Sequence, residues 1–181
     1  MNKIEVKENY KKLLKEKLSL DLTRGQPSKE QLKLSEPLDQ ILKNKFIFDG
    51  EDIRNYGLIK GLNSARKLGG ILLGVNYKNV IANGTSSLNL TFMALQALLF
   101  TGLNGSPWIN NKKISFLCPV PGYDRHFSLL ESVGIKMINV PLTGEGPDMD
   151  IVEKLITKDK TIKGIICVPK HSNPTGETYS A

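Results

Sequence analysis

The fold of this chain is decided by one stretch near its middle, Val80-Ile81-Ala82-Asn83-Gly84-Thr85-Ser86-Ser87-Leu88-Asn89-Leu90. Its pattern predicts a short buried strand over residues 80–82, a turn of small residues, and a helix over about residues 87–100. Gly84 allows the backbone to turn tightly, and the residues after it can present free N–H groups at the start of the helix. Such a turn suits a phosphate, because unpaired amides and the positive end of the helix dipole both favour negative charge. The plainer alternative, in which Thr85 and Ser86 only cap the helix, stays open on these residues alone.

After this stretch, short apolar runs alternate with helical patterns. Strands are predicted at residues 114–118, 136–140 and 162–168, with one helix starting near Asp124 and another capped by Asp148. Continuous apolar strands that alternate with helices are typical of a parallel sheet covered on both faces. The sequence therefore predicts an α/β fold with a mostly parallel sheet.

The residues before the stretch predict helices separated by loops. Apolar residues recur at helical spacing over residues 3–18, and further helices are predicted over residues 37–46 and 63–73. A loop with glycine at two positions, residues 55–62, leads into the last of these helices.

Composition and charge exclude several classes of function. The 181 residues are 40% hydrophobic and 24% charged, which is ordinary for a soluble globular protein. The net charge of +7 includes six lysines and three glutamates in residues 1–18, and the other lysines are scattered without a nucleic-acid motif, so nucleic acid is not an expected partner. No apolar run is long enough for a membrane span and no signal core begins the chain, which predicts a cytoplasmic protein without a membrane partner. His126 and His171 lie far apart without other ligand types around them, so no metal site is expected.

Polar or aromatic residues follow the predicted strands at what should be one edge of the sheet. In open α/β sheets, ligands bind where the strands end. The turn at residues 83–87 offers a phosphate site, the loop at residues 119–123 offers the ring of Tyr123, and the loop at residues 169–176 offers the amide of Asn173. A phosphate, a flat ring and a polar ring substituent together describe pyridoxal 5′-phosphate better than they describe a simple metabolite.

The chain also carries a series of motifs in a fixed order: Leu22-Thr23-Arg24-Gly25-Gln26-Pro27-Ser28, Arg54-Asn55-Tyr56-Gly57, Asn83-Gly84-Thr85-Ser86-Ser87-Leu88, Pro119-Val120-Pro121-Gly122-Tyr123-Asp124-Arg125-His126-Phe127 and Ser172-Asn173-Pro174-Thr175-Gly176. In these motifs the chain resembles the N-terminal part of a fold-type I, pyridoxal-phosphate-dependent aminotransferase. Within that class it is most similar to the aspartate aminotransferase subgroup that also resembles regulator-type aminotransferase domains. The resemblance covers nearly the whole chain from about residue 20.

The resemblance implies roles for individual residues in holding pyridoxal 5′-phosphate. Gly84, Thr85 and Ser86 match the turn that binds the cofactor phosphate. Tyr123 matches the aromatic residue that stacks on the pyridine ring, and Asn173 matches the amide that binds the 3-oxygen of that ring. Without the resemblance, Tyr123 could equally be an aromatic residue that covers the sheet edge, and Asn173 could be the start of a turn before proline.

The resemblance also implies a domain division and a partner. Residues 1–50 match an N-terminal segment whose helices belong to or bridge the small domain, and Gly25 lies where this segment closes over the substrate. Residues 51–181 match the N-terminal part of the large domain, which has three layers, α/β/α. Tyr56 matches a tyrosine that reaches the cofactor phosphate of the neighbouring subunit, which implies a homodimer; packing at an interface is the alternative role.

The family's proton-transfer residues match no position of this chain. In the resembling enzymes the Schiff-base lysine, the aspartate at the pyridine nitrogen and the arginine for the substrate carboxylate all lie further on, and Lys170 is at the wrong place to be that lysine. The chain is therefore expected to be a fragment, incomplete at its C-terminus, with no catalytic residue and no activity alone. Strands from the later part also separate the strand that matches residues 80–82 from the other three strands.

Three hypotheses for the function follow from the sequence. The first is a fragment of an aminotransferase, or transaminase, whose parent transfers an amino group between an amino acid, expected to be aspartate, and a 2-oxo acid. The second is a non-catalytic remnant or half-protein that binds a partner. The third is the aminotransferase-like effector domain of a transcription regulator, which the short segment before the first motif disfavours.

Overall fold

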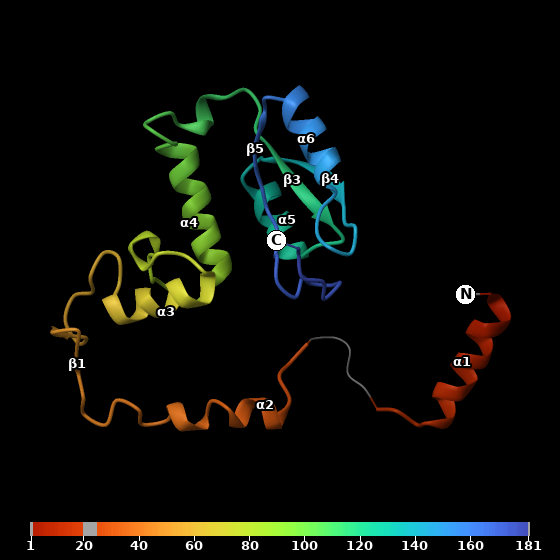
Figure 1. Cartoon of the computed structure of the whole chain (residues 1–181), viewed down its shortest axis with the longest axis horizontal. Coiled ribbons are helices and arrows are strands. Elements are labelled where there is room, and N and C mark those ends of the chain that lie inside the picture. The colour runs from red at the N-terminus through yellow and green to blue at the C-terminus, as the bar shows by residue number, and fades with distance from the viewer. Residues whose placement is uncertain (1, 20–24, 181) are drawn as a thin grey trace. The chain divides into compact units, whose positions relative to one another are not determined.

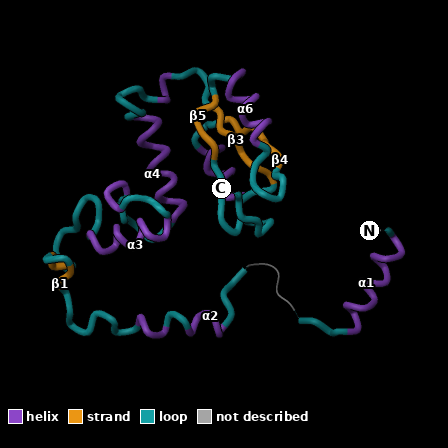
Figure 2. The backbone as a smooth tube through the Cα atoms, in the orientation of Figure 1, coloured by secondary structure: helices purple, strands orange, loops and turns teal. Residues whose placement is uncertain are grey.

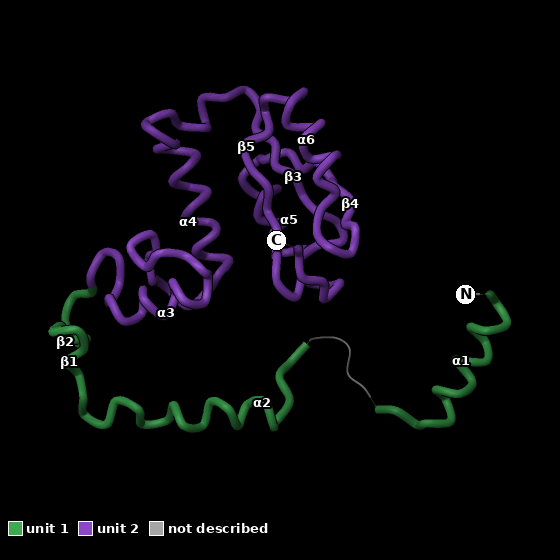
Figure 3. The backbone as a smooth tube through the Cα atoms, in the orientation of Figure 1, with its two compact units in different colours: residues 1–57 green, residues 58–181 purple. Residues whose placement is uncertain are grey.

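The computed structural model describes residues 2–19 and 25–180. The chain divides into two compact units, residues 1–57 and residues 58–181 (Figure 3). The first unit holds short elements: α1 (Lys3–Lys15), α2 (Lys29–Lys33), the 3-10 turn η1 (Glu36–Leu38) and the antiparallel pair β1 (Ile47–Phe48) and β2 (Glu51–Asp52).

The helix predicted over residues 37–46 is wrong. After η1 the chain forms successive turns, in which Gln40, Lys43 and Asn44 have positive φ angles of 56°, 35° and 63°. A right-handed helix cannot pass through such angles. The apolar side chains of Ile41 and Leu42 are 61% and 41% exposed. Little packing is therefore available to stabilise a helix of this length, and packing is the main source of helix stability in proteins.

The second unit begins with four helical elements and then alternates strands with helices (Figure 1). Its elements are α3 (Asn63–Leu73), η2 (Tyr77–Asn79), α4 (Ser87–Phe100), η3 (Trp108–Asn110), β3 (Ser115–Val120), α5 (Asp124–Ser132), β4 (Lys136–Pro141), α6 (Met149–Lys158) and β5 (Ile162–Ile165). The helices predicted over residues 63–73 and 87–100 are confirmed. Asp148 caps α6 as predicted, because its carboxylate accepts from the N–H of Ile151 at 3.1 Å.

The three strands form a parallel sheet in the order β4-β3-β5 (Figure 2). Side chains of the central strand β3 alternate between the two faces of the sheet. On one face, Phe116 and Cys118 pack in a buried cluster with residues of α4 and α5, namely Leu95, Leu99 and Leu130. On the other face, Leu117 packs against Val140 of β4 and Val152 of α6. Helices thus cover both faces, and the predicted parallel α/β arrangement is confirmed.

The strand predicted over residues 80–82 does not form. Val80 is extended, with φ −102° and ψ 135°, and is only 7% exposed, but no described strand pairs with it. Its polar backbone groups bond to other elements: Arg66 Nε donates to the carbonyl of Val80 at 2.9 Å, and the N–H of Ala82 donates to the carbonyl of Lys60 at 3.0 Å. A β-strand requires a neighbouring strand for its ladder, and here a side chain and a loop take that place.

The last predicted strand is shorter than expected. Assigned pairing of β5 ends at Ile165, and its register with β3 shifts between Ser115 and Phe116. The N–H of Ile166 still donates to the carbonyl of Leu117 at 3.1 Å. Within the described ranges, no helix combines the length and apolar character that crossing a membrane would need.

Candidate cofactor-binding site

The loops that follow β3 and β5 lie at the same edge of the sheet, because the two strands are parallel neighbours. The first loop leads directly into α5, and Tyr123 is the residue before that helix. The second loop, residues 169–176, carries Asn173. The Val120–Pro121 and Asn173–Pro174 peptide bonds in these loops are both cis.

Tyr123 is half-buried and packs edge-to-face on His126, with ring centroids 5.1 Å apart and planes at 84°. These residues are three apart at the start of α5, so their side chains share one side of it. Burial lowers the pKa of His126, which favours its neutral form. Gly122 is required beside them, because a Cβ atom there would lie 2.7 Å from both the ring of Phe127 and the carbonyl oxygen of Pro119.

The loop that carries Asn173 is tied down by its own backbone. The N–H of Ser172 donates to the carbonyl of Glu177 at 2.8 Å, and the carbonyl of Ser172 accepts from the N–H of Gly176. Ser172 is 5% exposed, whereas the next residue, Asn173, is exposed. The loop therefore anchors Ser172 inside and presents Asn173 to solvent.

The structure brings Tyr123 and this loop together. Tyr123 and His126 line one small cavity with Cys167, Ser172 and Tyr179. The cavity measures about 10 Å³, roughly the space of one water molecule, so these side chains are packed against one another. A ligand ring can therefore meet Tyr123 only from its solvent side.

The turn at Gly84, Thr85 and Ser86 has the free donors that an anion needs. Gly84 has a φ angle of +59°. Among the described residues, none accepts a hydrogen bond from the backbone N–H of Gly84, Thr85 or Ser86. The oxygen of the Ser86 side chain accepts from the N–H of Asn89 at 3.3 Å, so Ser86 caps α4 as the plainer alternative predicted. Capping uses the hydroxyl oxygen as an acceptor and leaves its O–H free to donate, so both roles are compatible.

The turn and the two loops lie toward the same end of the second unit. In Figure 1 the N-terminal end of α4 and the carboxyl ends of β3 and β5 all point to the lower side of this unit. The expectation of loops at one sheet edge is confirmed for residues 119–123 and 169–176. It is not met for the turn at residues 83–87, because residues 80–82 are not a strand of the sheet.

Segments next to the turn are held by Arg66, which sequence reasoning missed. Besides Val80, its guanidinium donates to the carbonyls of Tyr77 at 3.2 Å and Lys78 at 3.3 Å, and lies 5.6 Å from the ring centroid of Tyr77. Tyr179 was also missed, although it lies beside Ser172. The only sequence signal for Arg66 was a lone arginine in the helical pattern of residues 63–73.

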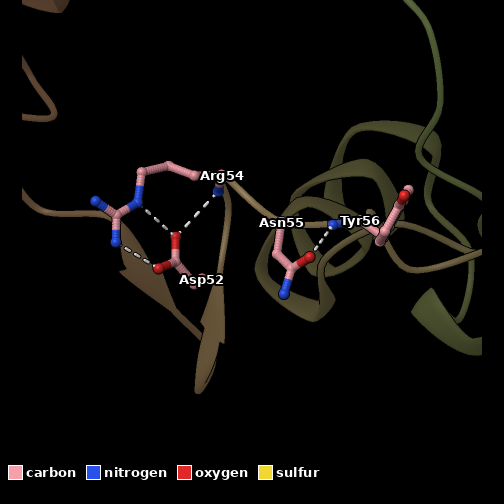
Figure 4. A network of polar contacts seen from close by, with 4 residues as sticks. All are labelled: Asp52, Arg54, Asn55 and Tyr56. Carbon is pink, nitrogen blue, oxygen red and sulfur yellow. Dashed lines mark hydrogen bonds and ion pairs between the residues drawn. The ribbon is translucent and has the colours of Figure 1, made fainter.

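Two further predicted residues belong to the first unit. Tyr56 is 99% exposed, and its N–H donates to the side-chain oxygen of Asn55 at 2.8 Å (Figure 4). Nearby, Arg54 pairs with Asp52 at 2.6 Å, and this hydrogen-bonded partner lowers the pKa of Asp52 to about 2. Gly25 is exposed with open space around it. The other family-matching residues before it, 22–24, lie outside the described residues.

Metal chemistry has no candidate centre in the part of the chain that the structure describes. There, no group of three or more His, Cys, Asp or Glu side chains is placed to hold an ion. The predicted residues at this end of the second unit are instead an exposed amide, a half-buried ring and a turn with free N–H groups. These fit the parts of pyridoxal 5′-phosphate that the sequence predicted, namely its 3-oxygen, its ring and its phosphate.

Comparisons with known proteins agree with this reading of the fold. A sequence model of the aspartate amino-transferase family matches residues 2–181. An aspartate aminotransferase of Corynebacterium glutamicum is 44% identical over 181 residues, which are 97% of this chain and 41% of that protein. A crystal structure of a protein from Corynebacterium diphtheriae has a TM-score of 0.84 at 46% identity, covering 98% of this chain and 44% of that one.

More distant structures share the fold alone. A kynurenine aminotransferase from Pyrococcus horikoshii has a TM-score of 0.67 at 21% identity, covering 100% of this chain and 44% of that one. These likenesses confirm the predicted class, the large-domain fold of fold-type I transferases. The chain spans about two fifths of the length of the curated relatives it matches, with 42% and 41% of their residues covered.

Proposed function

The chain belongs to the aspartate aminotransferase family, and from this we propose that it forms the N-terminal part of an enzyme that transfers an amino group between aspartate and a 2-oxo acid. The observation that carries the proposal is the joint placement of Tyr123 and the Asn173 loop at the ends of two parallel strands. Aspartate is proposed as the donor because the Corynebacterium glutamicum relative is named an aspartate aminotransferase.

We propose that the residues of this chain hold pyridoxal 5′-phosphate at both ends. Gly84, Thr85 and Ser86 would donate backbone N–H and hydroxyl hydrogens to the phosphate, and the N-terminus of α4 would add its dipole. Tyr123 would cover one face of the ring and restrict its tilt. Asn173 would donate its amide N–H to the 3-oxygen and so favour the ionised form of that oxygen.

The bound cofactor supplies an electron sink, which makes the proton on the substrate's α-carbon acidic enough to leave. The proposed part of this chain is to bind and orient the cofactor for that step. The cavity beside Tyr123 is lined by described residues that include no lysine. We therefore propose that the lysine that moves the proton is not part of the site formed by residues 58–181, and that the 181-residue chain alone does not catalyse transamination.

The first unit would contribute to substrate and subunit contacts. Tyr56 is almost fully exposed, so its hydroxyl is available to the phosphate of a second subunit in a homodimer. Gly25 has no side chain and open space around it, which suits a segment that closes over the substrate amino acid. Both proposed roles follow the family resemblance.

The exposed apolar faces favour a second candidate function, in which the chain binds a partner polypeptide. On α3, Ile71, Leu72 and Leu73 are 79%, 67% and 69% exposed, and Phe100 at the end of α4 is 62% exposed. Large apolar side chains left exposed at neighbouring positions, such as residues 71–73, favour association with another polypeptide. The two candidates are compatible if the partner is the remainder of an aminotransferase.

Equilibrium binding of pyridoxal 5′-phosphate to the purified chain tests the proposal. We expect saturable binding that inorganic phosphate competes away, and weaker binding by Thr85→Ala, Tyr123→Ala and Asn173→Ala. The matched control is Thr91→Ala, whose hydroxyl bonds to the carbonyl of Ser87 within α4. Absence of phosphate-sensitive binding by the folded wild-type chain would contradict the proposed site. An activity assay with aspartate and 2-oxoglutarate, on a protein of the relatives' length that carries these residues, tests the reaction itself.

A further inference from the structure

The segment that leads into the proposed phosphate turn is held at both of its ends by elements that precede it in the chain. This segment is residues 80–82. At its first residue, Arg66 Nε donates to the carbonyl of Val80 at 2.9 Å, and a Cβ atom at Gly69 would lie 3.0 Å from Cγ1 of Val80. Positions 66 and 69 are three apart, so they share one side of α3. That side of α3 therefore packs directly against Val80, which is only 7% exposed.

The last residue of the segment, Ala82, is held by the loop at residues 58–61. The N–H of Ala82 donates to the carbonyl of Lys60 at 3.0 Å. Gly61 has a φ angle of +82°, and a Cβ atom there would overlap the carbonyl oxygen of Ala82. A residue with a side chain at position 61 would therefore have to displace Ala82, besides adopting a strained backbone conformation.

The turn is fixed on its other side by α4. The carbonyl of Ser86 accepts from the N–H of Leu90 at 3.1 Å, within the first turn of that helix. A Cβ atom at Gly84 would lie 3.7 Å from Cδ2 of Leu90, so the turn also lies against the helix that it starts. Only residues 83–85 connect the fixed Ala82 to the fixed Ser86. This short connection carries two of the N–H groups that the proposed function assigns to the phosphate.

We propose that Gly61 and Arg66 are positioning residues for the phosphate: they fix residues 80–82 and thereby hold the N–H groups of the turn in place for a phosphate dianion. Among the described residues no strand pairs with this segment, and the loop and α3 supply the contacts that a sheet would otherwise give. Donors that are already ordered in the free protein bind more tightly, because binding need not order them. The inference rests on the proposed function, since it assumes that residues 84–86 bind the phosphate of pyridoxal 5′-phosphate.

The test compares Gly61→Ala and Arg66→Lys with the wild-type chain. Gly61→Ala adds one methyl group at the contact with Ala82 and changes no charge. Arg66→Lys keeps the positive charge and removes the forked hydrogen bonds, so it separates positioning from simple attraction of the anion. Gly134→Ala is the matched control for the glycine, because Gly134 also has a positive φ angle, +73°, but a Cβ atom there would meet nothing within 4 Å. Affinities for inorganic phosphate and for pyridoxal 5′-phosphate are measured where the fluorescence of Trp108 shows each variant to be folded.

We expect Gly61→Ala and Arg66→Lys each to weaken binding of inorganic phosphate by about tenfold, the effect of losing one hydrogen bond to a charged group. Binding of pyridoxal 5′-phosphate should weaken by the same factor, because the change concerns the part that the two ligands share. Gly134→Ala should lower the urea midpoint through its strained backbone and leave both affinities unchanged. Equal losses of affinity in Gly61→Ala and Gly134→Ala would overturn the proposal in favour of a general effect on stability. Unchanged phosphate affinity in Arg66→Lys would overturn it in favour of the charge alone.

Hydrogen exchange on the ligand-free chain separates this inference from the proposed function. Both variants should speed exchange at the N–H of Ala82 and leave exchange in β3 unchanged. If Gly61→Ala does not fold, Arg66→Lys alone decides, and unchanged exchange at Ala82 in that variant would overturn the positioning role. If the wild-type chain binds both ligands and the folded variants bind them as tightly, only the positioning role fails. If the folded wild-type chain binds neither ligand, the proposed function fails and the ligand part of this inference fails with it.

Discussion

Replacing Arg66 by methionine should destabilise the second unit, because this side chain holds the segment before the Gly84 turn. The substitution keeps a long unbranched side chain and removes the guanidinium. Four hydrogen bonds are lost with it: Nε to the carbonyl of Val80 at 2.9 Å, two from Nη2 to the carbonyls of Tyr77 and Lys78, and one from Nη1 to the side chain of Asn63.

The magnitude follows from burial. The bonds to Val80 and Tyr77 are partly buried, whereas those to Lys78 and Asn63 are exposed, where water replaces the lost partner. A bond with one charged partner contributes about 1.5 kcal/mol or more, so the two partly buried bonds give a loss of about 3 kcal/mol. Val80 is 7% exposed, so its carbonyl has no ready access to water after the change. For a unit of this size the loss corresponds to a fall in Tm of about 10 °C.

Urea unfolding measured by the fluorescence of Trp108 is a suitable assay. Trp108 is the single tryptophan of the chain and packs in the core cluster of the second unit, 9% exposed. Lys67→Met is the matched control, since it removes the same charge from the neighbouring position. The reasoning is refuted if the two variants unfold at the same urea concentration, or if exchange at the N–H of Ala82 is no faster in Arg66→Met than in wild type.

Other predictions concern titration and capping. Burial lowers the pKa of His126 below its ordinary value of 6.5, so the unfolded chain binds the proton more tightly than the folded chain does. The contribution of neutral His126 to the free energy of unfolding should therefore be full above about pH 6.5 and fall as the pH decreases below it. The urea midpoint of His126→Phe should not show this dependence on pH. Burial raises the pKa of Tyr179 and the charge of Glu177 raises it further, so Glu177→Gln should lower that pKa in an ultraviolet absorbance titration, and an unchanged titration would disprove the contact. Asp148→Ala should cost about 1 kcal/mol of stability by urea unfolding, since Asp148 caps α6, while Asp148→Asn should retain most of it.

The sequence predicted best those elements whose pattern and tertiary environment agree. The strands β3 and β4 are short apolar runs with helices on either side, and they formed in parallel where they were expected. The loop residues Tyr123 and Asn173 could be placed together, since the ends of neighbouring parallel strands share one edge. Their roles toward a cofactor remain predictions, because they depend on a ligand and on geometry beyond the backbone.

Where the prediction failed, the missing information was how the segment contacts distant parts of the chain. Residues 37–46 have apolar residues at helical spacing, but most of these side chains are exposed, and positive φ angles at Gln40, Lys43 and Asn44 give turns instead. Residues 80–82 have the composition of a buried strand and an extended Val80, yet a strand also needs a neighbour, which the local sequence does not reveal. Arg66 could not be assigned either, since it bonds to carbonyl groups that every residue has.

The two sides of the proposed site are held by different means, which makes them separable. Arg66 in α3 fixes the segment that leads to the phosphate turn, through carbonyls of residues 77–80. On the ring side, the N–H of Tyr179 donates to the carbonyl of Pro169 at 2.8 Å, and the ring of Tyr179 lies against Gly146. What joins the two is the packing of α4 on β3 and α5, far along the helix from the turn, where Leu95 and Leu99 meet the sheet. A perturbation at Arg66 should therefore weaken phosphate binding without changing the ring environment, and one at Tyr179 should do the reverse.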